Sequence, residues 1–168
     1  MTLRPTRDRR VPQPGCRGFT LIELVVALAL LGLLAMTALP VAELGHQRSQ
    51  EAELRRALRE IRGALDAWRA AVDAGQIARD PGQSPWPPTL DALVAGAVNQ
   101  KDPAGGRLLF LRRLPRDPFA EPALGAAQSW RTRASDSPHD DPRPGRDVFD
   151  VMSASPRQAI DGSALASW

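Results

Sequence analysis

Cysteine, histidine and lysine are scarce in this sequence of 168 residues. Cys16 is the single cysteine, so no disulfide can form within the chain. His46 and His139 are isolated, with no second ligand of metal-site spacing near either. The sequence also contains no nucleophile and base arrangement, no glycine-rich phosphate loop and no cysteine pair. We therefore expect a protein that is not an enzyme and needs no cofactor.

The body of the chain lacks an excess of positive charge. The formal net charge is +3, but residues 1–18 hold five arginines against one aspartate, which leaves 17 basic and 18 acidic residues in the rest. The basic character therefore belongs to an N-terminal leader. Because the body has no electrostatic reason to bind phosphate backbones, we expect no nucleic-acid partner.

Charged residues are absent from Leu24 to Ala42, whereas Glu23 lies just inside the apolar run that begins at Phe19. A run of this length approaches the roughly 20 apolar residues that cross a bilayer as a helix, with the basic leader on the cytoplasmic side. A secretory signal peptide fits less well, because its apolar region spans only about 7–15 residues. A plain single-pass anchor explains the topology and leaves Glu23 unexplained, since an ionised side chain in hydrocarbon is costly.

The segment G-F-T-L-I-E-L, from Gly18 to Leu24, resembles the processing motif of type IV prepilins and of the pseudopilins of type II secretion systems. The resemblance implies that a prepilin peptidase cleaves after Gly18 and that Phe19 becomes the N-methylated first residue. It also implies that Glu23 stays within the membrane helix. Cleavage exposes a positive amine on Phe19, and a buried charge needs a partner, so Glu23 of a neighbouring subunit can accept it.

Pro40 also has a place in this resemblance. Proline removes a helical hydrogen bond and loosens the helix locally, and the family carries a proline near this depth that is associated with filament assembly. Two alternatives stay open: Glu23 is an interfacial acid at the headgroup level, and Pro40 marks the membrane exit of an ordinary anchor.

An amphipathic helix is predicted beyond the apolar run, ending at the cap signal Gly75. Apolar residues recur there every three or four positions: Leu54, Leu58, Ile61, Leu65, Trp68 and Val72. Three same-face ion pairs are expected along it: Glu51 with Arg55, Arg62 with Asp66, and Arg69 with Asp73. The stripe must pack on a domain, although coiled-coil dimerisation is an alternative interpretation.

The remaining segment, 76–168, reads as a small globular domain. A short helix is predicted from an N-cap at Thr89 to a stop at Gly96, and strands are expected around 107–113, 128–133 and 147–153. The predicted fold is α+β, with a long N-terminal helix packed on an antiparallel sheet of about three strands, as in pilins. The predicted parts are a removed leader (1–18), a transmembrane and filament-core helix (19–44), an amphipathic stalk (45–75) and the globular domain (76–168).

Three segments of this domain, "WPPTLDALV", "FLRRLPRDPF" and "DVFDVMSAS…AIDGSALASW", resemble the G-type major pseudopilin. The resemblance implies a periplasmic filament of identical subunits that drives protein secretion, with a cytoplasmic ATPase and an inner-membrane platform as partners. It also implies a single-pass protein of the bacterial inner membrane with a periplasmic C-terminal domain.

The family's calcium site is not matched intact here, and no EF-hand pattern is present. The candidate calcium ligands are Asp147, Asp150 and Asp161. The alternative functions are a minor type IV or competence pilin, which shares the stem, and a membrane-anchored binding domain that does not polymerise.

Overall fold

The computed structural model describes residues 18–138 and 140–168, and of residues 37–42 it describes the backbone alone. The predicted leader, apart from Gly18, therefore lies outside the described residues, as do His139 and the side chain of Pro40. The chain divides into two compact units, Met1–Ala42 and Glu43–Trp168.

Helix α1 is the longest element and covers Leu21–Asp73, which is 53 residues. Gly18 to Thr20 precede it without helical structure. In the described part of the chain, no helix has a segment both long and apolar enough to cross a membrane. The transmembrane helix predicted over 19–44 is therefore not confirmed.

The apolar stripe in the second half of α1 is confirmed as the core of the unit Glu43–Trp168. Leu54, Leu58, Ile61, Leu65 and Trp68 are buried, and Val72 packs partly buried against them. Full burial of one large aliphatic side chain contributes about 1.5–3 kcal/mol. Several side chains of this kind lie on the stripe, so their burial makes a large contribution to the stability of the unit.

Gly75 ends α1 as predicted. It has φ +68°, its N–H donates to the carbonyl of Val72, and the N–H of Gln76 donates to the carbonyl of Ala71, both at 2.9 Å. This pair of bonds is the Schellman motif, which satisfies the last carbonyls of a helix and favours glycine because of its positive φ.

Helix α2, Asp91–Ala95, lies in the predicted place but starts differently. Its N-cap residue is Leu90, with no side-chain capping bond, so the prediction that Thr89 caps this helix was wrong. Gly96 stops the helix at φ +71°, and a Cβ there would lie 2.3 Å from the carbonyl oxygen of Leu108. Glycine is therefore required at this position for two reasons: the backbone has a positive φ, and a Cβ would clash with the neighbouring carbonyl oxygen.

The strands form two antiparallel pairs instead of the single sheet of about three strands that was expected. β1 (Ala97–Val98) pairs with β2 (Arg107–Leu108), and β3 (Trp130–Arg133) pairs with β4 (Asp150–Ser153). The α+β class is confirmed: a long N-terminal helix accompanies small antiparallel sheets, which is consistent with a pilin-like fold.

Two local contacts explain why the strands are shorter than predicted. The N–H groups of Phe110 and Leu111 both donate to the carbonyl of Leu93 in α2, which turns the chain out of β2. The N–H of Val148 donates to the carbonyl of Pro87 at 2.8 Å, so β4 begins only at Asp150. A short 3₁₀ helix, η1 (Ala127–Ser129), replaces the start of the predicted strand 128–133.

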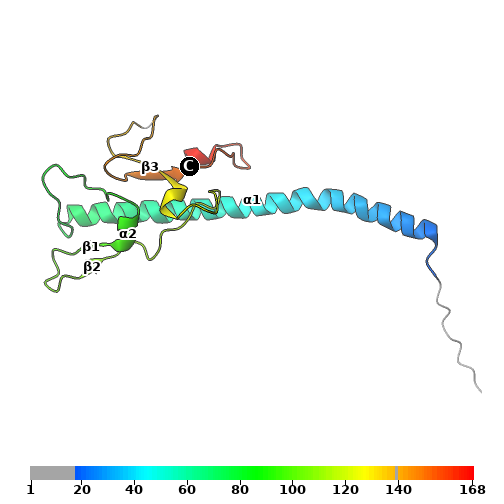
Figure 1. Cartoon of the computed structure of the whole chain (residues 1–168), viewed down its shortest axis with the longest axis horizontal. Coiled ribbons are helices and arrows are strands. Elements are labelled where there is room, and N and C mark those ends of the chain that lie inside the picture. The colour runs from blue at the N-terminus through cyan, green and yellow to red at the C-terminus, as the bar shows by residue number, and fades with distance from the viewer. Residues whose placement is uncertain (1–17, 139) are drawn as a thin grey trace, which may run out of the picture. The chain divides into compact units, whose positions relative to one another are not determined.

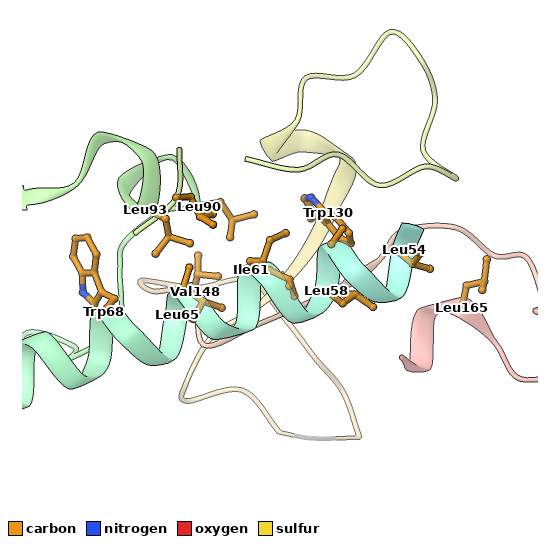
Figure 2. Packing of buried hydrophobic residues seen from close by; sticks show 14 of the residues in the cluster. Leu54, Leu58, Ile61, Leu65, Trp68, Leu90, Leu93, Trp130, Val148 and Leu165 are labelled. Atoms are coloured by element: carbon orange, nitrogen blue, oxygen red, sulfur yellow. The ribbon is translucent and has the colours of Figure 1, made fainter. Parts of the chain in front are cut away.

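Loops, α2 and the second sheet together cover the stripe. Figure 1 shows α2 and the pair β1–β2 beside the last part of α1, with β3 and the C-terminal segment also against it. Figure 2 shows Leu90, Leu93 and Trp130 above the side of α1 that carries Ile61. Leu165, in the 3₁₀ helix η2 (Leu165–Ser167), is fully buried and belongs to the same cluster.

One of the three predicted ion pairs along α1 forms. Arg69 Nε lies 2.9 Å from Asp73 Oδ2, whereas Arg55 pairs with Asp161 at 3.7 Å. Arg62 donates from Nε to Asp150 Oδ1 at 2.8 Å and from Nη2 to the carbonyls of Val151 and Trp168 at 3.0 and 2.6 Å. Its guanidinium therefore joins α1 to β4 and to the C-terminal segment, which the i, i+4 interpretation missed.

Candidate processing and assembly site

The start of α1 is defined by Thr20. Its Oγ1 accepts the backbone N–H of Glu23 at 3.3 Å, and its carbonyl accepts the N–H of Leu24 at 3.1 Å. These are the bonds of an N-cap residue, which supplies acceptors for N–H groups that the helix leaves unpaired. The peptide bond between Gly18 and Phe19 consequently lies outside the helix.

The role of Thr20 was missed when the sequence was interpreted. The signal was available, because threonine followed three residues later by glutamate is the spacing of a capping box. The same two residues belong to the G-F-T-L-I-E-L motif, so one short spacing carries both the motif and the helix cap.

Glu23 is the third residue of α1 and lies in its first turn. A carboxylate there is stabilised by the positive end of the helix dipole. Glu23 is exposed, and its carboxylate forms no ion pair with any residue that the structure describes. It is thus available to a cation from outside the subunit.

Exposed apolar side chains surround this carboxylate on every side of the helix. Phe19 is 83% exposed, Leu21 is 82% exposed and Ile22 is 68% exposed. Other large apolar residues continue this surface: Leu24, Val25, Val26, Leu28, Leu30, Leu31, Leu33, Leu34 and Met36. A helix that is apolar all round is typical of segments buried by lipid or by other helices.

The predicted residues of the N-terminal site are brought together only in part. Gly18 and Phe19 lie just before α1 and Glu23 lies in its first turn, whereas Pro40 lies further along α1 and its side chain is outside the described residues. The assignments of Gly18 and Phe19 to cleavage and methylation, and of Glu23 and Pro40 to assembly, stay predictions.

The three aspartates considered for calcium do not converge. Asp150 pairs with Arg62, and Asp161 accepts from the N–H and the hydroxyl of Ser163. Asp147 is buried elsewhere. No group of three or more metal-ligating side chains occurs within residues 18–138 and 140–168. The carboxylates are separated because each one serves a different loop contact.

Asp147 instead holds three segments together by hydrogen bonds. It accepts from the N–H of Ser135 at 2.8 Å, from the hydroxyl of Ser135 at 2.6 Å, and from the hydroxyl of Ser84. Burial raises the pKa of Asp147, but the bonds from Ser135 and Ser84 lower it by more, so the net pKa lies below 3.8. The carboxylate is therefore ionised and satisfied without a cation.

Asp117 forms a second buried polar cluster that we did not predict. Its Oδ2 accepts from the hydroxyl of Ser153 at 2.6 Å, and its own N–H donates to Ser129 Oγ at 3.1 Å. It lies in the turn "RLPRDPF", where its Oδ1 also accepts the N–H of Phe119. Both clusters are structural, since their acceptors are all occupied by donors of the same chain.

The described chain begins with the segment G-F-T-L-I-E-L at the start of a long helix with an exposed apolar surface, and a small α+β unit follows. Residues 14–39 match the model of the prokaryotic N-terminal methylation motif. This match supports a precursor of the type IV pilin-like or pseudopilin kind. The motif implies processing by a prepilin peptidase and pilus-type polymerisation, and it suggests a membrane-anchored N-terminus. Comparisons with curated proteins and with solved structures gave no match.

Proposed function

We propose that this chain is the precursor of a pseudopilin of a type II secretion system. The observation that carries the proposal is the methylation motif at residues 14–39, placed at the start of a helix with an exposed apolar surface. The precursor is stored in the bacterial inner membrane, with its N-terminus in the cytoplasm and the unit Glu43–Trp168 in the periplasm. Prepilin peptidase cleaves after Gly18, and the amine of Phe19 is methylated.

Assembly follows from charge pairing in this proposal. The apolar stems pack together, away from water, where an unpaired amine or carboxylate is costly. Glu23 of one subunit accepts the amine of Phe19 from the next subunit, which both recruits and registers the incoming subunit. An inner-membrane platform and a cytoplasmic secretion ATPase extract the subunits into a periplasmic filament, and Pro40 loosens the stem as they move.

The resemblance of three segments in the C-terminal unit to the G-type major pseudopilin supports a secretion pseudopilin over an adhesive pilus subunit. The three segments that carry the resemblance supply buried residues around the stripe: Pro87 and Leu93 from the first, Asp117 from the second, and Ser153 and Leu165 from the third. Leu93 and Leu165 belong to the hydrophobic core, and Ser153 donates to Asp117, so the resembling segments contribute to the interior of the unit.

Substitution of Gly18 tests the proposal. Gly18→Val should block maturation, because a subsite built for a residue without a side chain cannot admit a branched one. The matched control is Gly32→Val, since a Cβ at either glycine meets no atom within 4 Å in the structure. Cleavage of the control should be normal, and N-terminal sequencing of the mature wild-type chain should begin at Phe19.

Two other results would contradict the proposal. A mature chain that begins after Ala38 or Ala42 would establish a conventional signal peptide. A processed chain whose deletion abolishes surface pili but leaves type II secretion of a reporter enzyme unchanged would establish a type IV pilin instead.

A further inference from the structure

Only two side chains between Phe19 and Met36 are polar, and they belong to Thr20 and Glu23. The structure links these two residues directly, because Thr20 Oγ1 accepts the N–H of Glu23 at 3.3 Å. The hydroxyl is thus bonded to the backbone of the very residue whose carboxylate is available for an external cation. The neighbours Phe19, Leu21, Ile22 and Leu24 are all exposed apolar side chains that cannot replace it.

We propose that Thr20 is a positioning residue for Glu23, which holds the first turn of α1 so that the carboxylate meets the amine of a neighbouring subunit. This inference rests on the proposed function, because it assumes that subunits polymerise through that pair. Without the hydroxyl, the N–H of Glu23 has no acceptor within the helix, since an N3 group cannot bond to a preceding turn.

Loss of this capping bond should cost more free energy in the assembled stem than it would at a helix end in water. In the assembled stem the apolar surface of residues 19–36 is covered, so water cannot replace a lost acceptor. The first turn then unwinds or shifts to satisfy the N–H of Glu23, and the carboxylate leaves the position at which the amine arrives. The carbonyl of Thr20, which accepts from Leu24 at 3.1 Å, is lost to the helix in the same step.

The experiment compares Thr20→Val, which keeps the branched shape and removes the acceptor, with Thr20→Ser and Thr20→Asn, which keep an acceptor. The same change at the other threonine of the apolar run, Thr37→Val, is the control. Filaments of the full chain are treated with a carbodiimide, which condenses a carboxylate and an amine into an amide with loss of water. The product between Glu23 and the Phe19 amine is quantified by mass spectrometry. The background is low because Lys101 is the single lysine.

We expect the Glu23–Phe19 crosslink of Thr20→Val to fall about fivefold, the shift that loss of a typical cap produces, at equal membrane abundance and equal cleavage after Gly18. Thr20→Ser, Thr20→Asn and Thr37→Val should crosslink like the wild type. Hydrogen exchange at the amide of Glu23 should accelerate in Thr20→Val alone.

Three results would overturn the assignment. Wild-type crosslinking in Thr20→Val would show that the hydroxyl does not position Glu23, and equal failure of the serine and asparagine variants would show that its acceptor is not what matters. Loss of cleavage in Thr20→Val would move the role of the hydroxyl to recognition by the peptidase. Failure of the proposed function is distinguishable, because the wild-type chain itself would then show no cleavage after Gly18 and no intersubunit crosslink.

Discussion

Replacement of Asp147 by asparagine should destabilise the C-terminal unit and remove part of its acid sensitivity. The side chain is 1% exposed and accepts two hydroxyl groups and one backbone N–H, from segments 84 and 135. Hydrogen bonds to a charged group contribute about 1.5–3 kcal/mol each. The amide keeps one acceptor for the N–H of Ser135, and the serine hydroxyls can rotate, so the expected loss is about 2–3 kcal/mol.

The pH dependence follows from the lowered pKa of Asp147. Because the folded-state pKa lies below 3.8, the unfolded chain takes up a proton here at higher pH than the folded chain does. The stabilisation is therefore complete above the unfolded value and is lost as the pH falls through the lower folded value. Asp147→Asn should flatten the part of the stability profile below pH 3.8.

Urea unfolding of the full chain in detergent, followed by tryptophan fluorescence, measures this effect. All four tryptophans, at positions 68, 86, 130 and 168, lie in the unit Glu43–Trp168, so the signal reports on that unit alone. With a slope of about 2 kcal/mol per M urea, the midpoint should fall by about 1–1.5 M. Asp66→Asn is the control, since Asp66 is an exposed aspartate of α1 outside this cluster. Equal midpoints and equal acid profiles for the two variants would refute the structural role of Asp147.

Two further substitutions test other parts of the molecule. Glu23→Ala should leave cleavage and membrane abundance normal but abolish filaments, because an unpaired buried amine costs roughly 3–5 kcal/mol. The filament yield is compared with that of the control Glu43→Ala. A normal yield from Glu23→Ala would show that Glu23 is only an interfacial acid. Gly96→Ala should lower the urea midpoint more than Gly75→Ala does. Both glycines have positive φ, but only at Gly96 would the new Cβ collide, 2.3 Å from the carbonyl oxygen of Leu108. Equal decreases in the midpoint would mean that the backbone conformation alone requires glycine at Gly96.

Local patterns in the sequence predicted the features that depend on neighbouring residues. The stripe from Leu54 to Trp68 was visible because helical periodicity places these side chains on one face. The stop at Gly75 was visible for the same reason, since a helix end is determined by a few adjacent residues. The pair of Arg69 and Asp73 formed as expected because both residues lie on one helix face, one turn apart.

Long-range contacts were not predictable in this way. Arg62 has Asp66 one turn away, but it binds Asp150 and the carbonyl of Trp168, which only the folded chain brings near. Asp147 was considered as a calcium ligand because several other aspartates lie near it in the sequence. In the folded chain its carboxylate instead accepts hydrogen bonds from Ser84 and Ser135. The motif at the helix start could be recognised from the sequence because its residues are contiguous, and residues 14–39 match the methylation motif. The roles of Gly18, Phe19, Glu23 and Pro40 stay predictions, and the cap at Thr20 was missed.

The shortness of the strands has a consequence for how the sequence of this domain can vary during evolution. Sheets of two and four residues per strand cannot stand alone, so the segments after residue 75 take their arrangement from the stripe on α1. Lengthening an exposed loop between them costs little, because closure entropy grows slowly with loop length. Variation should therefore concentrate in the loops that face solvent, while the stripe and its few buried anchors change together or not at all.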